Sequence, residues 1–144
     1  MASIYDLKPR FQALLRPLAG FLARAGVTAN QVTIAAVLLS LATGAALLIW
    51  PWAMLLVPGA LFVRMALNAI DGMLAREHGQ KSRMGAVLNE LGDAVSDSAL
   101  YLPFGRAPGI NSWLVILVVV LALLGELAGV VAVQIGTERR YDGP

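Results

Sequence analysis

Carboxylates stand inside stretches of this sequence that are otherwise apolar enough to cross a bilayer. Asp71 lies in one such stretch, and Asp93 and Asp97 lie in the next. An ionisable side chain in the hydrocarbon region costs roughly 2.5–3.5 kcal/mol on insertion scales, so each of these groups needs a partner. The sequence therefore predicts a functional site at this depth, with the surrounding helices as its scaffold.

The polar residues of these two stretches recur at helical spacing. The first stripe follows the spacing i, i+4, i+7, i+11 and consists of Arg64, Asn68, Asp71 and Ala75. The second recurs every four residues and consists of Gly85, Asn89, Asp93 and Asp97. Residues at such spacing share one helix face. Because only a short polar loop separates the stretches, we expect antiparallel neighbouring helices with a polar pocket that opens toward the loop.

Facing carboxylate and amide oxygens repel one another unless they are protonated or bridged by a cation. Hard oxygen donors suit Mg²⁺, Mn²⁺ or Ca²⁺, and the chain has no cysteine and a single histidine, His78. Such an ion attracts phosphate, and the small residues Gly72, Ala75 and Gly85 leave helix backbone open to a bulky nucleotide or headgroup. Metal and phosphate together point to phosphoryl transfer.

The composition is that of an integral membrane protein. Of the 144 residues, 58% are hydrophobic and only 14% are charged, and the mean hydropathy is +0.73. The formal net charge is +2, but the basic residues border apolar runs instead of forming one patch. We therefore expect them to set membrane topology and expect no nucleic-acid partner.

We expect a polytopic bundle of the all-α class, with residues 1–144 forming one membrane domain. Residues 8–25 place apolar side chains at helical spacing among basic ones, which predicts an interfacial amphipathic helix; a basic juxtamembrane tail is the alternative. Four apolar runs follow, each about 18–24 residues long, which is enough to cross a ~30 Å hydrocarbon core. They are predicted at 32–49, 53–75, 84–104 and 112–135.

Basic residues flank the apolar runs mainly on one side. They precede the first run, lie around the 77–83 loop and follow the fourth run: Lys8, Arg10, Arg16, Arg24, Arg76, Lys81, Arg83, Arg139 and Arg140. The other loops contain only Arg106. The positive-inside rule therefore predicts a multi-pass protein of the cell (inner) membrane, with both termini and the 77–83 loop in the cytoplasm.

The two polar stripes together resemble the signature of the CDP-alcohol phosphatidyltransferase family. The matching pattern reads Asn68-x2-Asp71-Gly72-x2-Ala75-Arg76-x8-Gly85-x3-Asn89-x3-Asp93. It spans 26 positions and is specific in residue type and in spacing. Residues 26–30, which precede the first run, and the amphipathic helix before them also look family-like, so the resemblance covers nearly the whole chain.

The resemblance implies an enzyme of phospholipid synthesis that transfers a phosphatidyl group from a CDP-linked lipid, such as CDP-diacylglycerol, to an alcohol acceptor and releases CMP. It implies Asp93 as the general base that deprotonates the acceptor. One or two Mg²⁺ or Mn²⁺ ions would be held by Asn68, Asp71, Asn89 and Asp93, with Asp97 as a further candidate. The nucleotide pocket would consist of Gly72, Ala75, Arg76 and Gly85. The resemblance also favours a homodimer among membrane lipids.

The sequence departs from the family pattern at two of its four acidic positions. Asn68 and Asn89 replace Asp there, which removes up to two negative charges but keeps an oxygen ligand at each position, so we expect weaker metal binding. Asp97 either replaces part of that charge or hydrogen-bonds to a neighbouring helix. Arg64 is expected to be a counter-ion for the acidic stripes or for Glu126.

The number of spans is a second departure, because the family usually has six and this chain has room for four. We therefore expect a fragment or a truncated gene product that lacks two C-terminal helices. A catalytically degenerate homologue that binds nucleotide or lipid without turnover is one alternative function. A cation or proton transporter that uses the same carboxylates is another, although it gives Gly72, Ala75 and Arg76 no reason to recur at this spacing.

Overall fold

Helices follow one another along the described part of the chain, and no strand occurs within it. The computed structural model describes residues 4–134. Its α-helices are α1 (Ile4–Arg24), α2 (Ala29–Ile49), α3 (Val57–Glu77), α4 (Arg83–Tyr101) and α5 (Ser112–Gln134). Two short 3-10 helices, η1 (Pro51–Leu56) and η2 (Leu102–Arg106), stand before α3 and after α4. The predicted all-α class is confirmed.

The predicted runs correspond to the observed helices, with differences at their ends. The run predicted at 53–75 is the end of η1 followed by α3, which has Pro58 in its first turn, where a missing N–H breaks no helical hydrogen bond. The run predicted at 84–104 divides in the same way into α4 and η2. Position 135 and the basic residues Arg139 and Arg140 lie outside the described residues.

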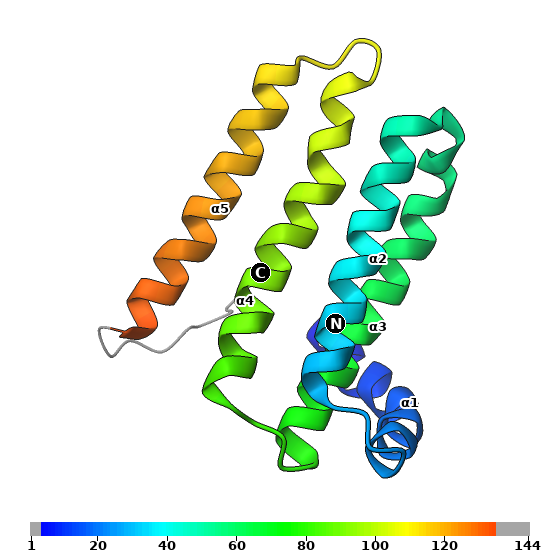
Figure 1. The fold of residues 1–144 in the computed structure, drawn as a ribbon, viewed down its shortest axis with the longest axis vertical. Coiled ribbons are helices and arrows are strands. Elements are labelled where there is room, and N and C mark those ends of the chain that lie inside the picture. The colour runs from blue at the N-terminus through cyan, green and yellow to red at the C-terminus, as the bar shows by residue number, and fades with distance from the viewer. Residues whose placement is uncertain (1–3, 135–144) are drawn as a thin grey trace.

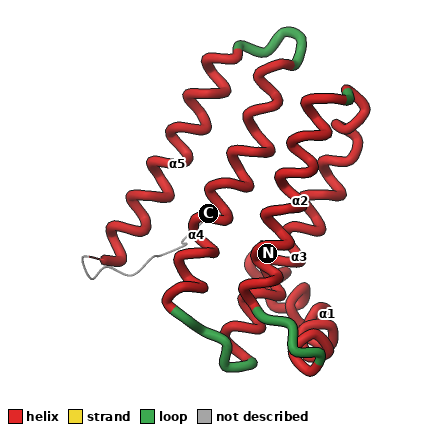
Figure 2. Tube along the Cα trace, in the orientation of Figure 1, coloured by secondary structure: helices red, strands yellow, loops and turns green. Residues whose placement is uncertain are grey.

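Helices α2, α3, α4 and α5 stand side by side and alternate in direction (Figure 1). Short connections join them at the two ends of the bundle (Figure 2). Helix α1 lies at the end that also carries the loop between α3 and α4, whereas α5 stands at the opposite edge, beside α4 (Figure 1). This up-and-down order makes α3 and α4 antiparallel, as predicted. The prediction that they are packed neighbours is wrong, because among the described residues α2 packs against both helices and α3 and α4 do not pack directly on each other.

Side chains fix where α2 and α4 begin. Thr28 accepts a hydrogen bond from the backbone N–H of Gln31, whose side chain accepts one from the N–H of Thr28 in return, at 3.3 and 2.9 Å. Such a capping box satisfies two N–H groups that have no partner inside the helix. The Ser82 hydroxyl caps α4 by accepting from the N–H of Gly85 at 2.9 Å. Both caps lie at the end of the bundle where the polar stripes begin.

Small residues bring the helices close together. A Cβ atom on Gly44 of α2 would lie 2.2 Å from the backbone oxygen of Ala99 in α4, so only glycine permits this approach. Helix α1 packs on α3 through a second contact, in which Ala19, Met73 and Leu74 are almost fully buried. Small residues at such interfaces are typical of helix packing in membranes.

Three described helical segments are long and apolar enough to cross a membrane: Ala29–Ile49, Trp52–Glu77 and Ser112–Ala132. Helix α4 is not among them because its 19 residues include Arg83, Glu90, Asp93 and Asp97. It nevertheless runs beside α2 and α5 along the bundle (Figure 1). The span predicted at 84–104 therefore stays a prediction, and its charged residues require partners within the bundle.

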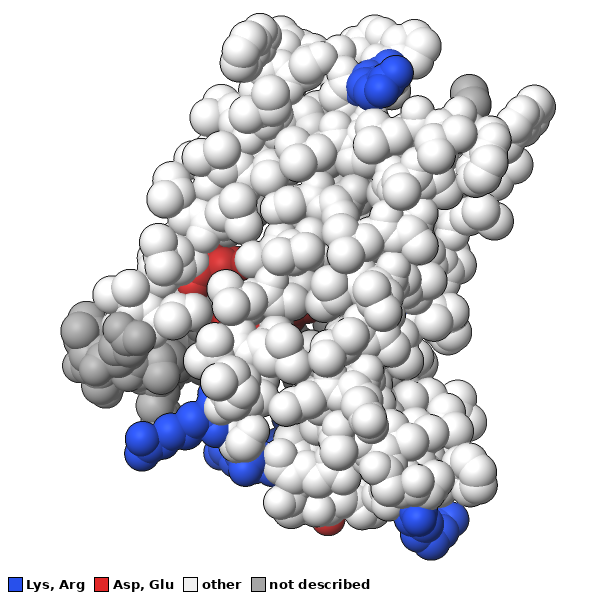
Figure 3. Space-filling view, viewed as in Figure 1, with Lys and Arg blue, Asp and Glu red and all other residues white. Residues whose placement is uncertain are grey.

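Charged side chains are unevenly distributed over the two ends of the molecule. In Figure 3, basic side chains gather mainly at the end that carries α1 and the α3–α4 loop, one basic group lies at the opposite end, and acidic atoms show at mid-height in a recess. The 3-10 helix η2, at the opposite end, contains Arg106. This asymmetry is the one on which the predicted orientation rests.

Candidate functional site

A cavity of about 370 Å³ lies among α2, α3 and α4 near the end with the α3–α4 loop. Its lining includes the start of α2, the second half of α3, the loop after it and the first half of α4. Eight of the nine site residues predicted from the sequence line it: Asn68, Asp71, Gly72, Ala75, Arg76, Gly85, Asn89 and Asp93. The ninth, Asp97, does not. The facing stripes of α3 and α4 thus share one polar pocket.

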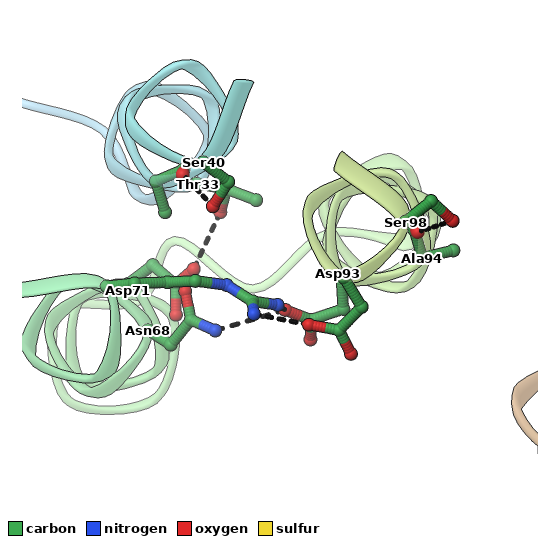
Figure 4. A network of polar contacts seen from close by, with 10 residues as sticks. Thr33, Ser40, Asn68, Asp71, Asp93, Ala94 and Ser98 are labelled. Atoms are coloured by element: carbon green, nitrogen blue, oxygen red, sulfur yellow. Dashed lines mark hydrogen bonds and ion pairs between the residues drawn. The ribbon is translucent and has the colours of Figure 1, made fainter. Parts of the chain in front are cut away.

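Asp71 is the most buried carboxylate of this pocket, with 5% of its surface exposed. The hydroxyl of Thr33 on α2 donates a hydrogen bond to Asp71 Oδ2 at 2.8 Å, and Figure 4 shows the two side chains pointing toward each other across α2 and α3. A buried charge needs such a donor, because its desolvation is otherwise uncompensated. The sequence reading missed Thr33 as a site residue.

A signal for Thr33 exists in the sequence. The buried residues of α2 include Thr33, Ala36, Ser40, Thr43 and Gly44, which are small or hydroxyl-bearing and recur at helical spacing within an apolar run. Such a stripe marks a face that packs against other helices. It identifies the face, but which neighbouring residue Thr33 contacts depends on how α2 and α3 are packed.

Asp93 is held by two donors from α3. Asn68 Nδ2 and an Arg64 nitrogen, Nη2, both donate to Asp93 Oδ1 at 3.0 Å. The second guanidinium nitrogen, Nη1, pairs with Asp97 one turn further along α4. Arg64 is therefore a counter-ion of the acidic stripe, as expected, and Asp97 takes part in an ion pair behind the pocket.

The glycines of the pocket leave space that neighbouring polar side chains already border. A Cβ atom on Gly72 would lie 2.8 Å from an Arg76 nitrogen, and one on Gly85 would lie 2.9 Å from Asn30 Oδ1 and from Ser82 Oγ. A larger residue at either position would displace these side chains. The small residues thus keep helix backbone open beside a guanidinium, an amide and a hydroxyl.

Gln80 joins the two loops at the mouth of the pocket. Its Oε1 accepts from the N–H of Ala29 at 2.6 Å, and its Nε2 donates to the carbonyl oxygen of Val27 at 3.2 Å. Beside it, Arg16 of α1 makes two hydrogen bonds, of 2.9 and 3.0 Å, to the carboxylate of Glu77, which raise the pKa of Arg16. Gln80 thus links the start of α2 to the loop after α3, and Arg16 links α1 to the end of α3. Together these contacts fix the shape of the pocket mouth.

The residues of the pocket fit a divalent cation by their chemistry. Oxygen donors of two carboxylates and two amides, from Asn68, Asp71, Asn89 and Asp93, line the same cavity. Within residues 4–134, no three acidic, histidine or cysteine residues form a ready-made metal cluster. Mg²⁺ is usually bound by one or two carboxylates together with water and substrate phosphates. The pocket has that donor set, and phosphate oxygens would complete it.

Similar proteins are known from bacteria. The inner membrane protein YnbA of Escherichia coli (strain K12) is 51% identical over 144 residues, covering 99% of this chain and 72% of that protein. Phosphatidylinositol phosphate synthase of Mycobacterium marinum is 39% identical over 93 residues, which cover 63% of this chain and 38% of the synthase. The synthase of the same name from Corynebacterium glutamicum is 35% identical over 106 residues, which cover 70% of this chain and 45% of the synthase.

The aligned regions thus span less than half of either synthase. No solved structure matches the chain. The family model for CDP-alcohol phosphatidyltransferases matches residues 26–142, a range that includes every residue lining the cavity. The chain therefore belongs to the CDP-alcohol phosphatidyltransferase family.

Proposed function

We propose that this protein transfers a phosphatidyl group from a CDP-linked lipid, such as CDP-diacylglycerol, to an alcohol acceptor and releases CMP in phospholipid synthesis. Membership of the family supports this reaction class. The observation that carries the proposal is the single cavity lined by eight of the nine residues expected to bind metal, nucleotide and acceptor. The relatives named phosphatidylinositol phosphate synthases suggest phosphorylated polyols among the acceptors to test.

Each part of the pocket has a proposed role in binding the CDP-linked lipid. Gly72, Ala75 and Gly85 leave room for the nucleotide against helix backbone, and the Arg76 guanidinium pairs with phosphate oxygens. Mg²⁺ or Mn²⁺, held by the pocket's carboxylate and amide oxygens, would neutralise the diphosphate and polarise its phosphorus–oxygen bonds. Binding in this way places the lipid-side phosphorus beside Asp93.

Asp93 is the proposed general base. The bonds from Arg64 and Asn68 both fall on its Oδ1, so we assign Oδ2 to take the proton of the acceptor hydroxyl. The acceptor oxygen then bonds to the lipid-side phosphorus, the bond from that phosphorus to the bridging oxygen breaks, and CMP leaves. General-base catalysis of this kind typically contributes ~10²–10⁴ in rate.

We further propose that the protein lies in the inner membrane with the pocket mouth and both termini in the cytoplasm. In this orientation the pocket opens to the cytoplasm, from which a polar acceptor would enter and into which CMP would be released. The basic residues around α1 and the α3–α4 loop support it through the positive-inside rule. Membership of the family favours a homodimer. We also propose that the described residues form one membrane domain, with α1 at the membrane interface.

A second function, binding of the CDP-linked lipid without turnover, is favoured by one observation. Arg64 and Asn68 both engage the oxygen of the proposed base, and Asn also stands at position 89, where the family pattern has Asp. In that case, restoring Asp at positions 68 and 89 should produce activity that the natural chain lacks.

The test is CMP release from CDP-diacylglycerol by the purified protein in Mn²⁺ or Mg²⁺, with inositol phosphate, glycerol phosphate, serine and unphosphorylated alcohols as acceptors. Chelation of the metal should stop release, and Asp93→Asn should lower it at least about 10²-fold. Arg106→Met, at the opposite end of the bundle from the pocket, is the control variant and should leave release nearly unchanged. Folded protein that binds CDP-diacylglycerol but releases no CMP with any acceptor would refute the transferase and support the binding function.

A further inference from the structure

Arg64 stands behind the pocket and is not part of the family pattern that the chain matches. Its side chain is only 13% exposed, and its guanidinium pairs with both Asp93 and Asp97. The pocket is lined by Asp93 but not by Arg64 or Asp97. The ion pairs therefore close the inner end of the pocket with a fixed positive charge between α3 and α4.

The amide at position 68 reinforces this arrangement. Asn68 turns its Nδ2 toward Asp93, at 3.0 Å from Oδ1, so its own Oδ1 is the one atom it has left for a cation. A carboxylate at this position would face the oxygen of Asp93 with like charge. Amide, guanidinium and carboxylate thus pair with one another without a metal ion, although the buried Nε of Arg64 has no hydrogen-bond partner among the described residues.

The same contacts limit how many cations the pocket takes. Asp93 Oδ1 already accepts two hydrogen bonds. Its Oδ2 is the oxygen proposed to take the acceptor proton, so at most one lone pair of Oδ2 is left for a metal. Asp71 Oδ2 accepts the hydrogen bond from Thr33, so Oδ1 is the oxygen of Asp71 that is most available to a metal. With one oxygen from each of Asn68 and Asn89, the four polar positions of the family pattern supply about four donors, which suits one Mg²⁺ or Mn²⁺ completed by phosphate or water. Glu90 also lines the cavity but is not part of that pattern. A second ion between Asp93 and Asp97 would have to lie where the guanidinium is.

We infer that Arg64 takes the place of one divalent cation, so that this pocket binds a single Mg²⁺ or Mn²⁺. The inference rests on the proposed function only in that the pocket binds a divalent cation. It accounts for two features of the site. A largely buried guanidinium pairs with Asp93 and Asp97, and amides stand at two positions where the family pattern has carboxylates. Asp71, Asp93 and Asp97 together carry three negative charges and Arg64 carries one positive charge, so the net charge of −2 matches one dication.

The test is the number of Mn²⁺ ions bound per chain by the full protein in lipid nanodiscs, measured with Mn²⁺ alone by the electron paramagnetic resonance signal of the free ion and by calorimetry. The natural protein should bind one. Arg64→Met should raise the number to two, with a spin-coupled spectrum, whereas Arg64→Lys should keep it at one because the charge stays. Arg106→Met, at the other end of the bundle, is the matched control and should bind one.

Two ions or none in the natural protein would overturn the inference, as would one ion in folded Arg64→Met. If Arg64→Met does not fold, Asn68→Asp decides the question: with Arg64 in place it should bind one ion more tightly, and two ions would overturn the inference. CMP release is measured in parallel. Correct ion numbers without release would refute the transferase alone, and release with two ions in the natural protein would refute this inference alone.

Discussion

Replacing Thr33 by Val tests whether α2 belongs to the site. The substitution keeps the shape of the side chain but removes the hydroxyl that donates to Asp71 Oδ2 at 2.8 Å. Thr33 and Asp71 are 6% and 5% exposed, so water does not readily replace the lost donor. A hydrogen bond to a charged group contributes about 1.5–3 kcal/mol. We expect the free energy of unfolding to fall by that amount.

The same change should weaken metal binding. Asp71 is a proposed ligand, and Thr33 is the group that fixes its orientation. Loss of a partner that orients a metal ligand typically lowers metal affinity by about 10–100-fold. We therefore expect the Kd for Mn²⁺ to rise by this factor in Thr33→Val. The number of ions bound per chain should not change.

Thr43→Val is the matched control on the same helix. Thr43 is also nearly buried, and its hydroxyl donates to the carbonyl oxygen of Leu39, one turn earlier, at 2.8 Å. Thr33 Oγ1 also lies 3.1 Å from the carbonyl oxygen of Ala29, so its single hydrogen is shared between that oxygen and Asp71 Oδ2. Only Thr33 also reaches another helix. Denaturant unfolding in detergent and Mn²⁺ titration of both variants isolate the bond between helices from the bond within the helix.

Equal losses of stability and equal Mn²⁺ affinities in the two variants would refute a role for the bond between Thr33 and Asp71. A double-mutant cycle with Asp71→Asn gives a second check. Because Thr33 and Asp71 are in direct contact, their effects should not add, and a coupling of at least about 0.5 kcal/mol is expected. Additive effects would mean that the hydroxyl stabilises α2 alone.

Two further predictions concern the frame of the site. Gly44→Ala places a Cβ atom 2.2 Å from the backbone oxygen of Ala99, so α2 and α4 must separate. The free energy of unfolding should fall by at least about 1–3 kcal/mol. In the control Gly59→Ala, the new Cβ has no atom within 4 Å, and the free energy of unfolding should change by less than about 1 kcal/mol. An equal effect of the two would contradict the close contact. Gln80→Ala removes the hydrogen bonds to the Ala29 N–H and to the Val27 carbonyl oxygen. The free energy of unfolding should fall by about 1–3 kcal/mol, and the KM for CDP-diacylglycerol should rise. An unchanged KM would mean that substrate binding does not depend on this contact at the pocket mouth.

The parts of the site that sequence predicts are those fixed within one helix or by one short loop. The spacing of Asn68 and Asp71, and of Asn89 and Asp93, places each pair on one helix face by the helical period alone. The short loop then places both faces at the same end of the bundle, and α2, which packs against both helices, completes the cavity that they share. Even the counter-ion role of Arg64 follows from its place on the first stripe.

Contacts between helices distant in sequence were not predictable in the same way. Thr33 meets Asp71 across 38 positions, and Gln80 meets Ala29 across 51. Which side chain faces which depends on the rotation and separation of whole helices. Those are set by small residues such as Gly44, whose close contact with Ala99 appears only once α2 and α4 are packed.

Helix α1 shows the same limit at the level of a helix face. Its leucines predict one apolar side, but the structure divides that side between two environments. Leu15 and Leu22 pack against the buried cluster shared with α3, whereas Leu14 and Leu18 remain 76% and 46% exposed. Periodicity identifies an apolar face, but it does not say how much of that face another helix covers and how much is left for lipid.

The pairing of Arg64 also bears on how α4 stands in the bundle. Helix α4 is too rich in charge to qualify as a span by composition, yet Asp93 and Asp97 both direct a carboxylate oxygen to the guanidinium of Arg64. A charge in an apolar environment is tolerated when it is paired and hydrogen-bonded. Because Arg64 supplies that pairing from α3, the acidic stripe has a counter-charge before any metal binds. The helix that carries the proposed base can therefore pack beside apolar helices in the metal-free protein. The divalent cation is then required for substrate binding and not for the stability of the fold.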